Sequence, residues 1–368
     1  MGRPGGMRVA SRDRLAGRGA QIAACALLSL TAACEFPTQA PQFQQKWVIP
    51  TDSSALQVDS LVPPSIRVVG NTFQLQLSAL NNISRNYSSL CPGCPTGSNV
   101  AKRSFTASVP GTLTMDPDIL TSTVTSGSVN VTLTHTFAFD PLRPSAANRG
   151  FVVTILRNNG AIIGKDSVNG AQVSWPAGAP GLVRSVSVTA GAVLVGDITV
   201  DITIRSPDGD PATISAAQGI TVAISPQPLV VNAVRVRVLN RSVGSNNQAL
   251  NLSDIDQSIG DRVVSGAMLI TFGNPFAIAG TMTVAITAPA QNSSAAVNIV
   301  KSVTLTSAAT SAVRIGLTND DWKSIIGKAN VKLKLAGSVS GPAAGVNVAP
   351  GQALGLSNRL ELTLKVGG

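Results

Sequence analysis

Short segments in which apolar and polar residues alternate follow one another from Trp47 to the end of the chain. In residues 129–137, for example, Val, Val, Leu, His and Phe occupy every second position. A period of two places successive side chains on opposite faces of a strand, one buried and one facing solvent. Gly, Pro, Asn and Asp recur between the segments, where tight turns need them. The pattern predicts an all-β protein built from sandwich domains.

The same pattern repeats within the chain. When Ser126-Gly127 is aligned with Ser265-Gly266, the sequence SGSVNVTLTHTF lies opposite SGAMLITFGNPF. Further matches follow in the same order: 183–189 with 300–306, 196–204 with 327–335, and 220–224 with 360–364, and upstream 73–77 resembles 234–238. Such self-similarity indicates duplicated structural units. We therefore expect two tandem β-sandwich domains, at residues 56–228 and 229–368.

In strand number and spacing the two units resemble the immunoglobulin-like modules of bacterial surface proteins. The resemblance implies two antiparallel sheets in each unit, with binding residues on the loops at one end. The outward positions of two matching strands differ in charge, because Asp201 and Thr203 correspond to Lys332 and Lys334. This difference suggests the hypothesis that the copies meet different partners, or each other.

One or two short helices are expected within the second unit. Residues 317–326 have Thr318 or Asn319 as a helix cap, two Asp in the first turn, and Gly327 directly after the last residue. The apolar residues of this segment, Trp322, Ile325 and Ile326, would close one end of the sandwich. Residues 251–264 form a second candidate helix or turn, with Ser253 as its cap.

The first 33 residues have the build of an export signal. Five Arg and one Asp lie between residues 3 and 18, and an apolar run of small and aliphatic residues covers 22–33. Positive charge, a short apolar core and small residues at the end are the features of a cleaved signal peptide. The run is too short for a transmembrane helix, which needs about 20 apolar residues.

The end of this run, Leu30-Thr31-Ala32-Ala33-Cys34, resembles the lipobox of bacterial lipoproteins. The resemblance implies cleavage before Cys34, acylation of that cysteine, and residues 34–55 as a lipid anchor and tether. Thr31 departs from the aliphatic residue that the family prefers, and an ordinary signal peptide with a chance cysteine is the alternative. A second match ends at Cys25, but almost no apolar core precedes it. Glu35 after the cysteine favours the outer membrane of a Gram-negative bacterium.

Composition excludes several functions. Removal of residues 1–33, with five Arg and one Asp, lowers the net charge from +10 to +6. The remaining basic residues are spread out and are not interleaved with aromatic ones, so no nucleic-acid surface is indicated. Aromatic residues make up 4% of the chain, and the tryptophans at 47, 175 and 322 are isolated. They are expected to pack in cores and not to form a sugar-stacking platform.

The sequence Cys91-Pro92-Gly93-Cys94 is the sharpest local motif. A CxxC motif can be a redox pair, half of a zinc site or a small structural disulfide. Zinc needs about four ligands, and the exported chain would offer only Cys34 and His135 in addition. Because Pro92 and Gly93 lie in a turn-rich loop and exported proteins meet an oxidising environment, we expect a structural disulfide.

His135 is the single histidine of the chain. Any hydrolase triad would have to use it. It lies on the apolar side of its strand, however, at the position that Asn274 occupies in the other copy. Two different polar residues at one position suggest a shared structural role, such as hydrogen bonding to the backbone at the end of the strand.

Three pairs of acidic residues are weak candidates for calcium: Asp116 with Asp118, Asp254 with Asp256, and Asp208 with Asp210. Calcium requires six to eight oxygen ligands, and each pair supplies only part of such a shell. Asx turns and helix caps explain the same residues without a metal.

Taken together, these features predict a protein of the bacterial cell envelope that acts as a structural or protein-interaction module. No cofactor and no enzymatic activity are expected, and the partners are the membrane and an envelope protein or polysaccharide. The alternative is a calcium-dependent adhesin or polysaccharide-binding surface protein. A thiol–disulfide enzyme that uses Cys91 and Cys94 is the third possibility.

Overall fold

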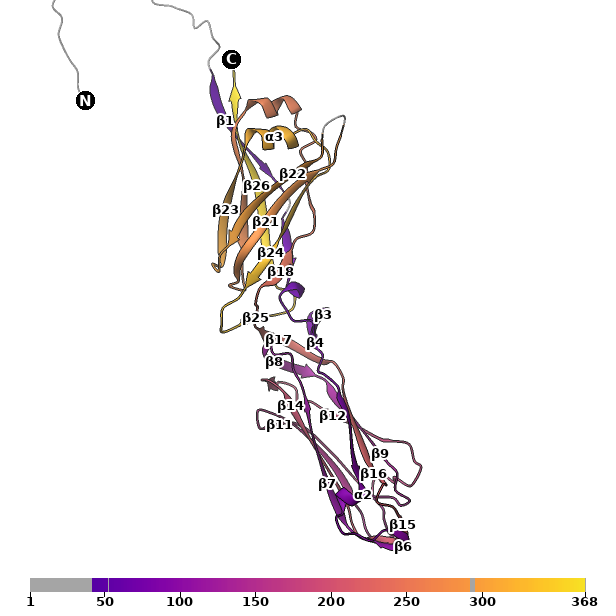
Figure 1. Cartoon of the computed structure of the whole chain (residues 1–368). Coiled ribbons are helices and arrows are strands. Elements are labelled where there is room, and N and C mark those ends of the chain that lie inside the picture. Colours follow the sequence, from indigo (N-terminus) through magenta and orange to yellow (C-terminus); the bar gives the residue numbers. More distant parts are fainter. Residues whose placement is uncertain (1–41, 52, 292–294, 368) are drawn as a thin grey trace, which may run out of the picture.

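The computed structural model describes residues 42–51, 53–291 and 295–367. The expected signal peptide and Cys34 lie outside these residues. The described chain is all-β, with antiparallel sheets and the short helical segments η1 (Val58–Ser60), α2 (Tyr87–Leu90), η2 (Gln257–Arg262) and α3 (Asn319–Ile325). None of these described segments has the length and apolar character needed to cross a bilayer. Figure 1 shows an elongated molecule with two lobes and a narrower waist.

The lobe that contains neither end of the described chain consists of two four-stranded sheets. The first sheet, called the β9 sheet, has the order β12 (Leu182–Ser187), β9 (Ser128–His135), β16 (Gly219–Pro226) and β5 (Leu80–Asn86). The second sheet has the order β11 (Ala161–Asn169), β10 (Phe151–Asn158), β14 (Ile198–Ser206) and β7 (Phe105–Leu113). A ribbon of β6 (Gly97–Lys102) and β15 (Gly209–Ile214) lies at its far end (Figure 1).

The other lobe contains both ends of the described chain. Its first sheet, called the β26 sheet, has the order β1 (Phe43–Pro50), β26 (Ala353–Val366), β20 (Val263–Gly273) and β23 (Thr310–Leu317), and β2 (Ser54–Gln57) also pairs with β26. Its second sheet has the order β18 (Arg241–Gly244), β24 (Val331–Ser340), β21 (Ala279–Ala288) and β22 (Val297–Leu305), and β19 (Gln248–Leu250) also pairs with β24.

A third group of strands forms the waist. Its sheet has the order β13 (Val193–Leu194), β8 (Ile119–Ser126), β17 (Leu229–Val236), β4 (Thr72–Leu75) and β3 (Ile66–Val69), with β25 (Val346–Val348) paired to β17. Strand β17, where the second domain was expected to begin, therefore pairs with strands that precede residue 229. The sequence repeat matches residues 73–77 with 234–238 as equivalents in two domains. In the structure these residues belong to the neighbouring strands β4 and β17 of one sheet, or directly follow them.

The strand order of both lobes is that of a jelly roll and not that of an immunoglobulin-like domain. In the lobe of the β9 sheet, we number only the eight strands of its two sheets, in chain order from β5 to β16. The first, eighth, third and sixth of these strands form one sheet, and the second, seventh, fourth and fifth form the other. The other lobe has the same order when β1 is counted as its first strand and β18 with β19 as its second. Two sheets of this order are the arrangement of an eight-stranded jelly roll. The immunoglobulin-like prediction is corrected accordingly.

Strand β1 also changes the predicted domain arrangement. It pairs with β26 from Phe43 opposite Val366 to Pro50 opposite Arg359, so part of the expected tether, residues 34–55, is a strand of the lobe. The lobe of the β9 sheet is therefore inserted between the first and second strands of the other lobe, and the two are not simply in tandem. Trp47 and Ile49 pack against the core. The strand protects an edge of β26 that would otherwise be unpaired.

The repeat seen in the sequence is partly a match of equivalent strands. Strands β9 and β20 are both third in their lobes, and β14 and β24 are both seventh. The match of 183–189 with 300–306 is wrong, because β12 pairs with β9 whereas β22 pairs with β21. The counterpart of β12 is β23. Alternation is alike in all these strands, so it cannot distinguish their neighbours.

The core consists of the residues that alternation placed inside. In β9, for example, Val129, Val131 and Leu133 are fully buried. Helix α3 begins at the expected cap, since the Thr318 hydroxyl accepts a hydrogen bond from the Asp321 N–H at 3.1 Å and Asp321 completes a capping box. The indole of Trp322 is buried directly over Gly266, where a Cβ atom would overlap it. Helix η2 is capped by Asp256 and not by Ser253.

Candidate functional site

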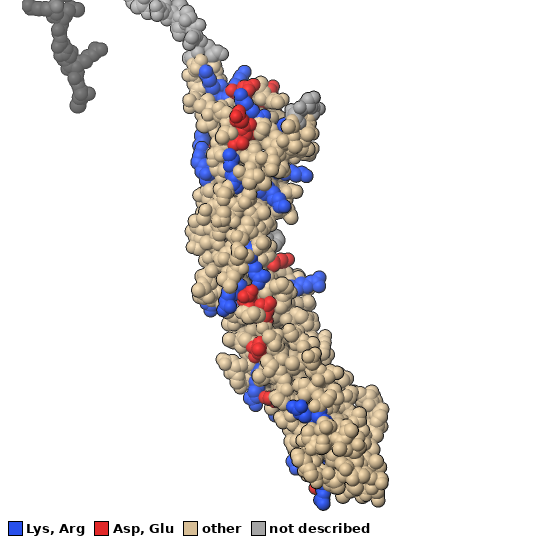
Figure 2. Space-filling model, in the orientation of Figure 1, with Lys and Arg blue, Asp and Glu red and all other residues tan. Residues whose placement is uncertain are grey.

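The residues with the greatest chemical potential gather at the end of the β9-sheet lobe that is far from the chain termini. This end, called the distal tip, contains α2, the β6–β15 ribbon and the last residues of β5 and β9 (Figure 1). It includes the single histidine and the single tyrosine of the chain. Charged side chains are sparse on the visible surface of this lobe, in contrast to the lobe of the β26 sheet and the waist (Figure 2).

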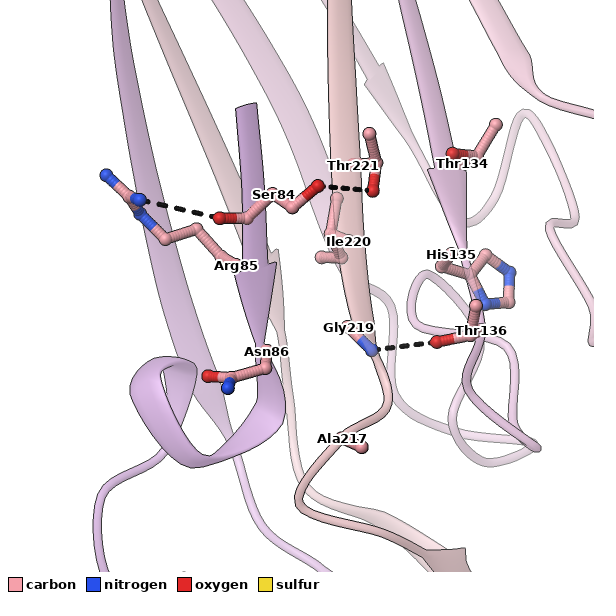
Figure 3. Close-up of a pocket in the computed structure, with 10 residues that line it drawn as sticks. All are labelled: Ser84, Arg85, Asn86, Thr134, His135, Thr136, Ala217, Gly219, Ile220 and Thr221. Atoms are coloured by element: carbon pink, nitrogen blue, oxygen red, sulfur yellow. Dashed lines mark hydrogen bonds between the residues drawn. The ribbon is translucent and has the colours of Figure 1, made fainter. Parts of the chain in front are cut away.

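A polar pocket of about 250 Å³ lies in the distal tip, where the strands β5, β16 and β9 end or begin (Figure 3). The residues that line it include Ser84, Arg85, Asn86, Thr134, His135, Thr136 and Thr221. The hydroxyl oxygens of Ser84 and Thr221 are 2.9 Å apart, and the Thr136 hydroxyl accepts a hydrogen bond from the Gly219 N–H at 2.9 Å. Hydroxyl and amide groups of this kind can hold a polar, uncharged ligand.

His135 lines this pocket, but its ring is held by the backbone. Its Nδ1 accepts a hydrogen bond from the Phe137 N–H at 3.2 Å, so the proton is on Nε2, which lies 3.0 Å from the Trp175 carbonyl oxygen and donates to it. Burial lowers the pKa of His135, which keeps the ring neutral. Neither nitrogen is left to accept a proton from the Ser84 hydroxyl.

Asn274 has the equivalent role in the other lobe. Its amide nitrogen donates to the carbonyl oxygens of Ile278 and Thr306 at 2.7 and 2.9 Å, and its Oδ1 accepts from the Ile278 N–H at 3.4 Å. Like His135, it therefore bonds to both a backbone donor and a backbone acceptor at the end of a strand. The shared structural role predicted for the two residues is confirmed by these contacts.

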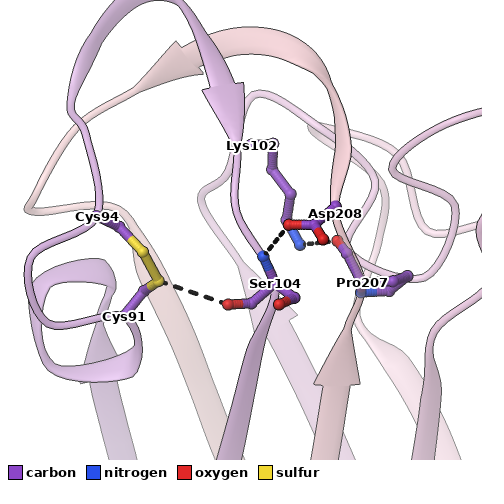
Figure 4. Close-up of a disulfide and its surroundings, with 6 residues drawn as sticks. All are labelled: Cys91, Cys94, Lys102, Ser104, Pro207 and Asp208. Carbon is purple, nitrogen blue, oxygen red and sulfur yellow. Dashed lines mark hydrogen bonds between the residues drawn. A yellow bond between two sulfur atoms is a disulfide. The ribbon is translucent and has the colours of Figure 1, made fainter.

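Cys91 and Cys94 form the expected disulfide (Figure 4). Cys91 follows the C-terminal end of α2, and its N–H donates to the Tyr87 carbonyl oxygen at 2.9 Å. Redox-active CxxC motifs instead place a cysteine at a helix N-terminus, where the helix dipole stabilises the thiolate. The bridge closes the loop that leads from α2 into the β6–β15 ribbon, which supports a structural role.

Lys102 lies beside this loop and is the feature that the sequence did not indicate (Figure 4). The residue is only 1% exposed, and its ammonium group donates to the Pro207 carbonyl oxygen and lies 4.8 Å from the centre of the Phe105 ring. Burial lowers the pKa of Lys102 to about 7, although the charge of Asp208 opposes the shift. Asp208 itself accepts from the Ser104 N–H at 2.8 Å.

The candidate calcium residues serve turns, caps and ion pairs. Asp116 accepts from the Asp118 N–H at 2.9 Å, and Asp118 lies 2.8 Å from Arg241 in an ion pair. Asp254 accepts from the Ser253 hydroxyl, and Asp256 caps η2 through the Ser258 N–H. The latter hydrogen bond lowers the pKa of Asp256. Within the described ranges, three or more His, Cys, Asp or Glu residues do not gather into a possible metal site.

The three tryptophans have the predicted structural positions. Trp175 and Trp322 are buried, and Trp47 packs against the core from β1. The His135 ring meets the Trp175 ring edge to face, with 4.4 Å between the ring centres. None of the three therefore offers an exposed face for stacking on a sugar.

Comparison with known proteins shows distant similarity to solved structures. No protein-family model matches the chain, and no curated protein is significantly similar in sequence. A predicted secreted protein from Parabacteroides distasonis is similar with a TM-score of 0.34 and 12% identity over 88% of this chain and 100% of that chain. The empty particle of cowpea mosaic virus is similar with a TM-score of 0.20 and 10% identity over 77% of this chain and 96% of that chain.

Proposed function

We propose that this protein is a non-enzymatic lipoprotein of the bacterial cell envelope, held in the membrane through Cys34, and that it presents the distal tip to an envelope partner. The observation that carries the proposal is the pairing of β1 with β26, from Phe43 opposite Val366. It places the first described residues at one end of the molecule, whereas the inserted lobe carries the distal tip at the opposite end (Figure 1).

The distance between anchor and fold supports attachment close to this end. Gln42, where the described chain begins, lies eight residues after Cys34. Eight fully extended residues span at most about 28 Å. An acyl group on Cys34 would therefore hold the lobe of the β26 sheet near the membrane. Two or more acyl chains make such attachment stable.

The engagement of the candidate catalytic groups supports a role without catalysis. Both ring nitrogens of His135 are bonded to the backbone, and Cys91 is bridged to Cys94. Nucleophilic catalysis needs a base within reach of the nucleophile. Ser84 in the polar pocket has no such base in His135, so the pocket supports binding better than reaction.

Intact mass and membrane fractionation of the protein produced in a Gram-negative host test the anchor. We expect a mass that corresponds to a chain starting at Cys34 with acyl chains, and recovery in the membrane fraction. Cys34→Ala should abolish both, whereas the matched variant Cys25→Ala should leave both unchanged. A soluble product cleaved at another position, or an unchanged Cys34→Ala protein, would overturn the proposal.

An uncharged polysaccharide is the second candidate partner. On the outer face of the β9 sheet, the strands β9 and β16 present Asn130, Thr132, Thr134, Thr221 and Ser225. The outward positions described on these two strands carry no charge. This face continues into the polar pocket. Binding of purified envelope polysaccharides that is weakened by Thr134→Val, and not by the change Thr283→Val on the other lobe, would favour this partner. Equal binding by both variants would exclude the face.

A further inference from the structure

The outer face of the β26 sheet is a compact basic surface. Leu360, Leu362 and Leu364 of β26 are buried, so the intervening residues from Arg359 to Lys365 face outward. The register of β1 places Lys46 opposite Thr363 on this face, and that of β20 and β23 brings Arg314 level with Arg359. We call the cations at 46, 314, 359 and 365, together with Glu361, the basic face.

Glu361 holds three of these four cations together without neutralising them. Its carboxylate lies 2.6 Å from Arg314, 3.3 Å from Arg359 and 3.4 Å from Lys46, and its side chain is only 7% exposed. The neighbouring strands place Ala267 and then Gly316 beside it, which leaves room for the arginine side chains. The Arg314 hydrogen bond lowers the pKa of Glu361, so this carboxylate stays ionised.

The resulting surface has an excess of positive charge that faces solvent. Among the described residues of the basic face, four cations and one carboxylate leave a net charge of +3. The side chains of Lys46, Arg314 and Arg359 are each more than half exposed although they contact Glu361. A structural ion pair would need one cation. The other three cations of the basic face remain available to an anionic partner.

The position of the basic face indicates which anion it meets. Lys46 lies on β1, four residues after Gln42 and twelve after Cys34, so the face includes a strand close in sequence to that cysteine. We propose that the basic face docks on the anionic phosphate headgroups of the membrane to which the chain is attached. This inference rests on the proposed lipid anchor, which would bring headgroups within reach of the face. Docking would hold the β26 sheet against the membrane surface.

Binding of the unacylated protein to lipid vesicles tests the inference. Every described helix and strand lies within residues 43–366, so a chain beginning at Glu35 keeps the whole described fold and lacks both the acyl group and the basic signal. We expect co-sedimentation with vesicles of equal parts phosphatidylglycerol and phosphatidylcholine at low salt. Binding should be lost with phosphatidylcholine alone, and also at high salt because exposed charges are screened.

A matched pair of variants locates the surface. The double change Lys46→Gln and Lys365→Gln should weaken binding roughly tenfold or more, since each cation near an anionic surface contributes about fivefold. The double change Lys332→Gln and Lys334→Gln alters the same charge on exposed positions of β24, in the other sheet of the lobe, and should change binding less than about twofold. Equal losses in the two variants, or no binding by the unchanged protein, would overturn the inference.

Failure of this inference can be separated from failure of the anchor. The vesicle experiment contains no acyl chain, so absent binding refutes the basic face and leaves the result for Cys34→Ala untouched. Conversely, a protein that is not acylated in cells but binds vesicles through Lys46 and Lys365 refutes the anchor alone. Melting temperatures of both double variants should match that of the unchanged protein, which excludes loss of binding through unfolding.

Discussion

Substitution of Lys102 by Met should remove a large pH dependence of stability from the inserted lobe. The ammonium group of Lys102 is buried against the rings of Phe105 and Phe139. Its pKa falls from 10.5 in the unfolded chain to about 7 in the folded protein. Between these values the unfolded state binds more protons than the folded state. The free energy of unfolding therefore increases as the pH rises.

The size of the effect follows from the two pKa values. From pH 7 to pH 9 the free energy of unfolding should rise by about 2 kcal/mol, because the unfolded chain binds the Lys102 proton more tightly than the folded protein does. This is a large part of the 5–15 kcal/mol that typically separates folded from unfolded proteins. His135 does not contribute in this window, because its pKa is lowered from 6.5. The methionine of the Lys102→Met variant would keep an unbranched apolar side chain among the two rings without a group that titrates.

Hydrogen exchange followed by mass spectrometry can measure this pH dependence of stability in the strands around Lys102. After correction for the intrinsic pH dependence of exchange, the opening free energy of peptides from β6 and β7 should rise by about 2 kcal/mol from pH 7 to pH 9. Lys102→Met should flatten the rise, whereas Lys332→Met on the other lobe should preserve it. A flat curve for the unchanged protein, or an undiminished rise in Lys102→Met, would refute the assignment of the effect to Lys102.

Two further substitutions test the packing and the topology. Gly266→Ala places a methyl group in the indole of Trp322 and should lower the free energy of unfolding by about 1–3 kcal/mol in urea denaturation; Gly316→Ala, which meets no atom within 4 Å, should not. A chain that begins at Thr51 lacks β1 and should lose roughly 2–4 kcal/mol of protection in β26, because Trp47 and Ile49 no longer cover the core. Unchanged exchange of β26 in that chain would contradict the role of β1.

Several features of the fold and the candidate site could be predicted from local sequence. Alternation identified β9 and β20 and their inward residues, because the period of two is a property of the strand itself. The buried residues of α3 followed from spacing within a single turn, and its cap is Thr318, one of the two residues that the sequence offered. The disulfide between Cys91 and Cys94 needs only two cysteines three residues apart in a turn-rich loop.

Other features depend on contacts between distant residues. Alternation tells which residues of a strand face inward, but not which strand lies beside it. For that reason the sequence pattern pairs β12 with the wrong counterpart and does not distinguish a jelly roll from an immunoglobulin-like sandwich. The polar pocket also depends on which strands are neighbours, because the residues that line it, such as Ser84, His135 and Thr221, come from three strands.

The sequence by itself determined the all-β character, the inward faces of the strands, the short helix α3 and the pairing of Cys91 with Cys94. Each of these depends on residues only a few positions apart. The tertiary structure alone decided that β1 completes a lobe whose last strand ends at Val366, that Lys102 is buried, and that Lys46 and Arg314 meet at Glu361. The physical reason is that these contacts join segments tens to hundreds of residues apart, which only the packing of the sheets brings together.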